Sequence, residues 1–253
     1  MKALRLVGVA LLAVVMCVNF ASCSEDDSLS KEKIGVLKNE KRLVKMVETW
    51  EGESDLVWTF NYDNNGRLLK ATLGKSETYD ITWEDNKIMC KVNNDYMRTL
   101  TLIDGLVQEV APYNAIHTYN SANRLIDVED IDGYGITAMW EKDKLVSFSG
   151  YEVRRTKKSD NTLTYETSCK KGYSPYIALL MRDMGQCVGL FMAHPELAGI
   201  RTTQLPASRT FTDNKSNDSF TETYTYEFDK DGYISKINLK QERYTGSCVL
   251  IWE

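Results

Sequence analysis

The chain has 253 residues, of which 43% are hydrophobic, 10% aromatic and 26% charged, with 15 Gly and 4 Pro. This composition excludes a disordered chain, a collagen and a small disulfide-rich scaffold, and the length is sufficient for one large domain or two small ones. The formal net charge is −5. Because binding to phosphates requires clustered Lys and Arg, this acidic chain is not expected to bind nucleic acid.

Residues 1–22 have the features of a bacterial secretion signal. Lys2 and Arg5 give a positive start, and an uncharged, mostly aliphatic run follows at residues 6–18. A permanent transmembrane helix needs about 20 apolar residues, so this run is too short to span a bilayer. Its length fits the apolar region of a signal peptide.

Small residues precede the cysteine in the sequence Phe20-Ala21-Ser22-Cys23. This arrangement resembles the lipobox of bacterial lipoproteins, in which the cysteine is acylated and becomes the first residue of the mature chain. The lipobox usually has Leu at the position of Phe20, so this sequence departs mildly from the pattern. Cys17 is the rival lipidation site, but the large Met16 before it disfavours cleavage there. We expect Cys23 to be the lipid anchor. The alternative is an ordinary cleaved signal with an incidental cysteine.

Residues 23–40 are expected to be the acylated cysteine and a flexible tether, because they are mostly polar and lack clear periodicity. As a coil the tether would reach about 20–25 Å. The acidic run Ser24-Glu25-Asp26-Asp27 resembles the signal that sends Bacteroidales lipoproteins to the outer face of the outer membrane. A solvated, disordered tether is the alternative, and the run can serve as both. We predict an outer-membrane lipoprotein that faces the cell exterior, with the periplasmic face as the alternative.

The sequence after residue 40 has the alternation typical of strands. Trp58, Phe60 and Tyr62 occupy every second position, as expected for a strand with one buried face. The turn Asp63-Asn64-Asn65-Gly66 follows. Asp in such a turn accepts backbone hydrogen bonds, and Gly can adopt the left-handed conformation without steric cost.

Similar units recur, with turns near residues 64, 85, 104, 121 and 142 and a last copy at 226–234. A spacing of about 20 residues fits two short strands and two connections, which predicts β-hairpins repeated along one sheet. A single hairpin is only marginally stable in water, so the units are expected to associate with one another.

Residues 62–68 read Tyr-Asp-Asn-Asn-Gly-Arg-Leu, which resembles the signature of tyrosine-aspartate repeats; the copy at 228–234 lacks the Arg. The mature chain as a whole is similar to an uncharacterised family of Bacteroidales lipoproteins with a porin-like fold. The similarity rests on the lipobox and on three segments, residues 41–46, 197–200 and 204–206. It implies a fold and a compartment, but no reaction.

One amphipathic helix is predicted at about residues 175–193. Ser174 is the expected cap, and Pro175 suits the first helical position. Gly185 and Gly189 each cost about 1 kcal/mol relative to Ala, so a bend or break is expected near them. The apolar stripe follows a 3.6-residue period and consists of Ile177, Leu180, Met181, Met184, Val188 and Phe191. We expect it to pack against the sheet.

The predicted fold class is therefore mainly all-β. We expect residues 41–253 to form a single domain, an antiparallel meander of hairpins in a curved sheet or a barrel-like soluble fold with the helix inserted. A membrane barrel also alternates apolar and polar residues. The short, charged strands and the lack of a sustained apolar band favour a soluble barrel or sheet with a packed interior. The sequence leaves the number of strands and the closure of the sheet open.

The sequence offers little for catalysis or metal binding. His117 and His194 are the only histidines, and neither lies in a zinc-ligand spacing, so no metal site and no cofactor is expected. Residues 213–219 are rich in Asp and Asn but lack the spacing of a calcium loop, which favours a hairpin tip. No nucleophile elbow, phosphate-binding loop or dinucleotide motif is present. We expect no enzymatic activity, although a glycosidase pair of carboxylates cannot be recognised from one sequence.

Four cysteines follow Cys23, namely Cys90, Cys169, Cys187 and Cys248. An oxidising envelope permits disulfides between them. At least Cys90 and Cys248 share a strand face with apolar residues, where a cysteine behaves as a small hydrophobe. Two alternatives stay open: four buried free thiols, or at least one bridge.

Aromatic residues give the one indication of function, because Trp and Tyr rings can stack on sugars as well as pack in sheets. We predict a non-enzymatic binding module at the cell surface, with a glycan or a surface protein as its ligand. The alternatives are a structural subunit of an envelope assembly and a lipid carrier.

Overall fold

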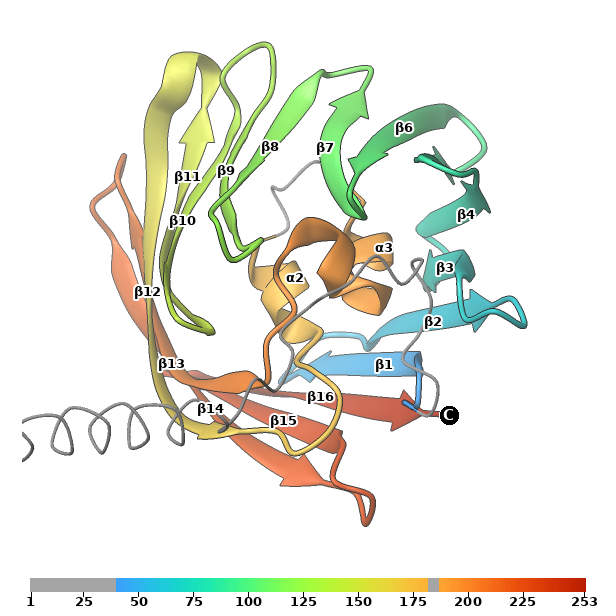
Figure 1. Ribbon diagram of the computed structural model, residues 1–253. Coiled ribbons are helices and arrows are strands. Elements are labelled where there is room, and N and C mark those ends of the chain that lie inside the picture. Colours follow the sequence, from blue (N-terminus) through green and yellow to red (C-terminus); the bar gives the residue numbers. More distant parts are fainter. Residues whose placement is uncertain (1–39, 182–186) are drawn as a thin grey trace, which may run out of the picture. The chain divides into compact units, whose positions relative to one another are not determined.

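The computed structural model describes residues 40–181 and 187–253, and their strands form one closed antiparallel barrel (Figure 1). Sixteen strands take part, and pairing of the first strand with the last closes the barrel. The predicted all-β antiparallel meander is confirmed, and the structure adds the strand number and the closure. The signal at 1–22, Cys23 and the tether up to residue 39 lie outside the described residues.

The strands are numbered in chain order. The first eight are β1 (Leu43–Trp50), β2 (Leu56–Tyr62), β3 (Leu68–Leu73), β4 (Glu77–Trp83), β5 (Lys87–Val92), β6 (Tyr96–Ile103), β7 (Leu106–Ala111) and β8 (Ala115–Tyr119). The other eight are β9 (Leu125–Glu129), β10 (Gly135–Glu141), β11 (Lys144–Glu152), β12 (Thr156–Ser168), β13 (Gln204–Asp213), β14 (Ser219–Phe228), β15 (Ile234–Gln241) and β16 (Tyr244–Trp252).

Antiparallel pairing of consecutive strands places the connections alternately at the two ends of the barrel. We call one end the terminal rim, because β1 begins and β16 ends there. The turns after the even-numbered strands also lie at the terminal rim. The opposite end, which we call the distal rim, has the turns that follow the odd-numbered strands.

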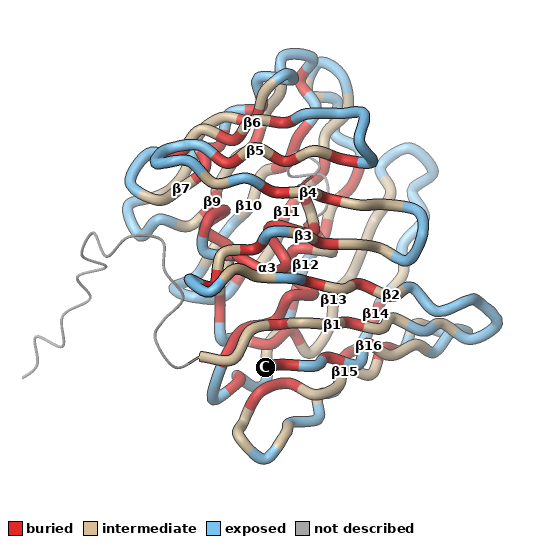
Figure 2. The backbone as a smooth tube through the Cα atoms, turned by 90° about the vertical axis from the view of Figure 1, so that its right-hand side faces the viewer, coloured by how far each residue is buried: buried red, intermediate tan, exposed pale blue. Residues whose placement is uncertain are grey.

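Buried residues recur at about every second position along most strands (Figure 2), and their side chains form the core inside the barrel. Ile88 and Ile237 are fully buried, and Trp83 is partly buried against the same core. The predicted inward apolar face is therefore confirmed.

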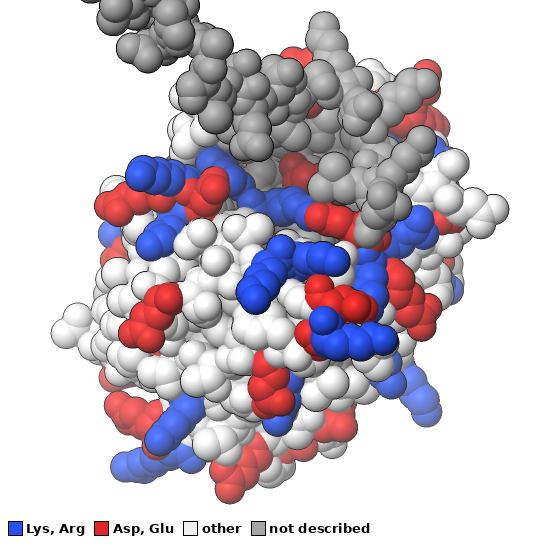
Figure 3. Space-filling model, turned by 60° about the horizontal axis from the view of Figure 1, so that its bottom comes forward, with Lys and Arg blue, Asp and Glu red and all other residues white. Residues whose placement is uncertain are grey.

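The outer wall has mostly polar side chains at the alternate positions, with exposed apolar ones such as Ile251 among them. Lys70 of β3 lies opposite Asp80 of β4, with Nζ 3.3 Å from Oδ1. The hydroxyl groups of Thr59 and Thr72 are hydrogen-bonded at 2.7 Å on β2 and β3. On the face shown in Figure 3, basic and acidic side chains are interspersed. These groups are suited to contact with water.

The connection between β12 and β13 turns into the barrel and fills it (Figure 1). Its described parts, residues 169–181 and 187–203, are called the plug below. The plug contains α2 (Tyr176–Leu180), α3 (Val188–Ala193) and the 3-10 helix η2 (Pro195–Ala198). Gly189 of α3 lies so close to the wall that a Cβ there would be 2.9 Å from Cβ of Ala71. The core is thus shared by the wall and the plug.

Two short helices replace the single helix that the periodicity predicted at 175–193, and residues 182–186 between them lie outside the described residues. The predicted cap at Ser174 is wrong. The helix begins one residue later than expected, Pro175 takes the cap position, and the Ser174 hydroxyl is buried without a hydrogen-bond partner. Within 40–181 and 187–253, no helix is long and apolar enough to cross a membrane.

The predicted turn after β2 is confirmed. Oδ1 of Asp63 accepts hydrogen bonds from the main-chain N–H of Asn65 and Arg67 at 2.8 and 2.9 Å. Gly66 has a φ of +83°, as the turn requires. Asp229 organises the turn after β14 in the same way. Each such turn leads directly into the next strand and so fixes the register of the hairpin.

Candidate ligand-binding site

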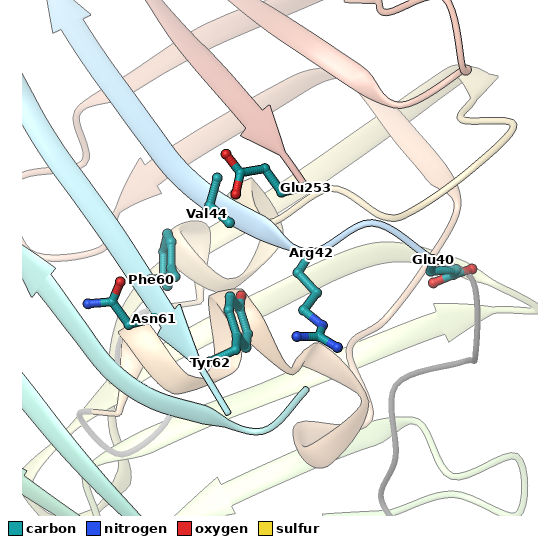
Figure 4. Close-up of a pocket in the computed structure, with 7 residues that line it drawn as sticks. All are labelled: Glu40, Arg42, Val44, Phe60, Asn61, Tyr62 and Glu253. Carbon is teal, nitrogen blue, oxygen red and sulfur yellow. The ribbon is translucent and has the colours of Figure 1, made fainter. Parts of the chain in front are cut away.

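A hollow of about 450 Å³ lies at the terminal rim, beside β1, β2 and the end of β16 (Figure 4). It combines a guanidinium, an amide, two carboxylates and two aromatic rings. The lining residues are Glu40, Arg42, Val44, Phe60, Asn61, Tyr62 and Glu253. Hydrogen-bonding groups therefore surround a small apolar surface.

Closure of the barrel builds this hollow, because its residues come from both ends of the described chain. The main-chain N–H of Arg42 donates to the carbonyl oxygen of Glu253 at 2.5 Å, and the N–H of Glu253 donates back to Arg42 at 2.9 Å. This pair of hydrogen bonds extends the β1–β16 ladder beyond the last strand residues. Glu253 is thereby held beside Arg42.

The Arg42 side chain is fixed against an aromatic ring. Its guanidinium carbon lies 5.7 Å from the centre of the Tyr62 ring, within the range of a cation–π interaction, and Nη1 donates to the carbonyl oxygen of Asp63 at 3.3 Å. The Tyr62 hydroxyl donates to the carbonyl oxygen of Leu43 at 2.7 Å. Burial raises the pKa of Tyr62, so the phenol stays neutral.

A charged network from the plug lies near the hollow. Nε2 of His194 accepts the main-chain N–H of Leu68 at 3.2 Å, and Nδ1 lies 2.8 Å from a carboxylate oxygen of Glu196. Neutral His194 therefore has its proton on Nδ1 and donates it to Glu196. Arg201 forms an ion pair with Glu40, which joins the plug to the start of the described chain.

A second, smaller cavity of about 150 Å³ lies between the plug and the inner wall of β10–β13. Its polar groups come from Lys158, Ser159, Asn161 and Arg209, and Nε of Arg209 donates to Oδ1 of Asn161 at 2.8 Å. Leu180 and other apolar side chains complete the lining. This volume is below the 300–1,000 Å³ of common ligand pockets.

The four cysteines of the barrel, Cys90, Cys169, Cys187 and Cys248, are buried and unbridged in the structure. Burial raises the pKa of Cys169 to about 11, which disfavours the reactive thiolate. Within the described residues, no group of three or more His, Cys, Asp or Glu side chains is placed to hold a metal ion. Asp213 accepts main-chain hydrogen bonds from Lys215 and Ser216, which confirms a hairpin tip there.

Comparison with solved structures supports the fold. The chain is similar to a porin-like protein from Bacteroides vulgatus ATCC 8482, with a TM-score of 0.61 and 13% identity over 85% of this chain and 99% of that one. A porin-like protein from Bacteroides uniformis ATCC 8492 gives a TM-score of 0.57 and 16% identity over 83% of this chain and 98% of that one. No family model and no curated protein matches the chain.

These similarities confirm the porin-like fold that the resemblance implied. At such low identity they concern the fold alone. The assignments to a lipoprotein family and to tyrosine-aspartate repeats have no support from a family match.

Cys23, the one site residue expected from the sequence, lies outside the described residues. The hollow at the terminal rim has no local signature in the sequence. Tyr62 was recognised only as part of a hairpin, while Arg42 and Glu253 are 211 positions apart and meet only because the barrel closes. The site therefore depends on the β1–β16 pairing, which only the fold reveals.

Proposed function

We propose that the chain is a lipid-anchored protein of the outer membrane whose barrel is a non-enzymatic binding module at the cell surface. The ligand class is a glycan or a surface protein. The plug is the main support for this proposal. A barrel filled by its own helices and apolar core is a rigid scaffold and not an open channel.

The outer wall supports a water-exposed barrel. A barrel that spans a membrane presents an apolar band about 25 Å tall to the lipid. Here the wall has pairs such as Lys70–Asp80, and charges of both signs are spread over the face shown in Figure 3. Attachment through acylated Cys23 would hold such a barrel at the membrane without inserting it.

The hollow at the terminal rim has groups that suit a polyhydroxylated ligand. Arg42 and Asn61 can donate hydrogen bonds to sugar hydroxyls, and the carboxylate of Glu253 can accept them. The Tyr62 ring supplies an apolar surface beside these groups. The interior cavity of about 150 Å³, by contrast, is too small for the acyl chains of a membrane lipid, which argues against a carrier.

Fractionation of cells that export the full chain tests the anchor. We expect the wild-type protein in the outer-membrane fraction and Cys23→Ala in the soluble fraction. Protease treatment of intact cells then reports which side of the membrane the barrel occupies. Membrane association of Cys23→Ala that resists high salt and carbonate would contradict the anchor.

Reconstitution of the protein in liposomes distinguishes a filled barrel that acts as a scaffold from an open channel. The purified full chain in liposomes is expected to leave sugar permeability unchanged in a swelling assay. Ligand is then sought with a glycan array and with cross-linking in intact cells. A fixed stoichiometric protein partner without any glycan would favour the assembly subunit, and sugar permeation through the barrel would overturn the scaffold.

A further inference from the structure

Three neighbouring connections at the distal rim each expose apolar side chains. They are residues 112–114 after β7, residues 130–134 after β9 and the 3-10 helix η1 (Val153–Arg155) after β11. The exposed fractions are 41% for Tyr113, 73% for Ile131, 44% for Tyr134 and 43% for Val153. We call Tyr113, Ile131, Asp132, Tyr134, Val153 and Arg154 the aromatic corner.

Main-chain hydrogen bonds join the three connections to one another. The N–H of Ile131 donates to the carbonyl oxygen of Tyr113 at 3.2 Å. The N–H of Arg154 donates to the carbonyl oxygen of Asp132 at 2.7 Å. These cross-loop bonds hold the aromatic corner in one arrangement before any ligand arrives, which lowers the entropic cost of binding.

The contact between the second and third connections is tight and strained. A Cβ on Gly133 would lie 2.8 Å from the main-chain nitrogen atoms of Arg154 and Arg155, so only glycine permits this approach. Arg154 and Arg155 both have φ values of +57°, in the left-handed region that is strained for residues other than glycine. Such strain is concentrated at binding and active sites in proteins.

The turn at residues 130–134 has a counterpart at the terminal rim, residues 229–233, with the same sequence pattern Asp-x-Asp-Gly-Tyr. In both turns the first carboxylate accepts 2.9 Å hydrogen bonds from the N–H groups two and four residues later, and the glycine is left-handed. The backbone of the turn is therefore the same at the two rims.

The side chains of these two turns have different surroundings. Tyr233 is 2% exposed and packs on Trp252 with 5.5 Å between ring centres, whereas Tyr134 stands at the surface. The second position is Lys230 at the terminal rim and Ile131 at the distal rim. Since the turn folds with a charged residue there, its geometry does not require an exposed isoleucine. The apolar surface of the aromatic corner needs another explanation.

Within the described part of the chain, the side chains of Arg154 and Asp132 take part in no ion pair. The adjacent Arg155, by contrast, pairs with Asp127 and lies 4.5 Å from the ring of Tyr151. Arg154 offers hydrogen-bond donors and Asp132 offers acceptors, with no net charge between them. A ligand that fits them supplies both acceptors and donors, as sugar hydroxyls do.

We infer that the aromatic corner binds a neutral extracellular glycan, with Tyr113 and Tyr134 stacked on sugar rings and Arg154 and Asp132 hydrogen-bonded to hydroxyl groups. This inference rests on the proposed function and assigns its ligand class and position. The corner lies at the opposite end of the barrel from Glu40, where the proposed tether joins. A glycan could therefore approach it from the side away from the membrane.

The test uses the purified full chain and an array of neutral gluco-, xylo- and manno-oligosaccharides, with acidic polysaccharides as a second set of probes. We expect binding to neutral probes, and about a tenfold or larger loss of affinity for the double variant Tyr113→Ala/Tyr134→Ala. The matched control is Tyr96→Ala/Tyr244→Ala. These tyrosines are 64% and 58% exposed at the ends of distal-rim turns outside the corner, and their loss should change affinity less than twofold.

Further variants show whether a failed test refutes binding at the aromatic corner alone or the proposed function as a whole. Arg154→Gln is expected to weaken binding severalfold without changing the melting temperature. Equal losses in the two tyrosine pairs, or preference for acidic probes, would overturn the inference. Glycan binding that is lost in Asn61→Ala but retained in the corner variants would place the site in the hollow, and the proposed function would stand. A wild-type protein that binds a surface protein and no glycan would likewise refute only the inference.

Discussion

At the terminal rim, the indole nitrogen atoms of Trp83 and Trp252 each donate a 2.7 Å hydrogen bond to a main-chain carbonyl oxygen. At the distal rim, the rings of Tyr113 and Tyr134 stand at the surface. The same kinds of side chain therefore stabilise the fold at one end of the barrel and remain available to a ligand at the other. The aromatic content of a β-barrel therefore indicates binding only where the rings are not already needed for packing.

The two tyrosines at equivalent turn positions, Tyr233 and Tyr134, should differ most in their contribution to stability. Tyr233→Ala should lower the free energy of unfolding by about 3 kcal/mol, because it removes a buried ring from the core. Tyr134→Ala, at the same position of the same kind of turn, should change it by less than about 0.5 kcal/mol. Urea unfolding of the two variants measures the difference. Similar losses would show that the two rims contribute alike to stability.

Two glycine substitutions measure how much the close packing of the connections at the distal rim contributes to stability. Gly133→Ala should cost about 2–3 kcal/mol, because the new Cβ would collide with the main chain of η1 in addition to straining the backbone. Gly52→Ala has nearly the same φ, +83° against +84°, but meets nothing within 4 Å, so about 1 kcal/mol is expected.

Thermal and urea unfolding of both glycine variants, together with the glycan affinity of each, are the measurements. A loss of affinity in Gly133→Ala alone would link the packing of the loops to binding. Equal unfolding free energies would contradict the tight contact between the connections.

A smaller effect is expected on the pH dependence of stability. Burial alone would raise the pKa of Asp229, but hydrogen bonds from the Tyr233 main chain and from Lys41 outweigh burial and hold that pKa below its usual value. A lowered pKa in the folded state stabilises the protein above the unfolded value of about 3.9, and this stabilisation is lost as the pH falls through the folded value. Lys41→Gln should therefore make the loss of stability below about pH 4 shallower.

Unfolding midpoints in urea between pH 6 and pH 2.5 measure this dependence. Lys75→Gln, at an exposed position of the β3–β4 turn, is the control and should follow the wild type. Curves for Lys41→Gln that coincide with those of the wild type would show that the ion pair at the terminal rim contributes nothing.

Local sequence was sufficient to predict the hairpins and the turns at Asp63 and near residue 229, because each depends on a period of two and on one carboxylate with its glycine. It could not predict the plug inside the barrel, since an apolar helical stripe packs equally well on either face of a sheet. It also could not distinguish Tyr134 from Tyr233, which share one local pattern. Which of them is buried depends on the end of the barrel that each turn occupies, and hence on the whole topology.

The ion pair between Arg201 and Glu40 has a mechanical consequence. If the proposed anchor at Cys23 pulls on the chain, the force reaches residue 40 before it reaches β1. Arg201 transmits part of this load to the plug, where its guanidinium also lies 5.1 Å from the centre of the Tyr173 ring. Tension on the chain would thus be shared between the helices and the β1–β16 seam, and single-molecule pulling of Arg201→Gln should open that seam at lower force.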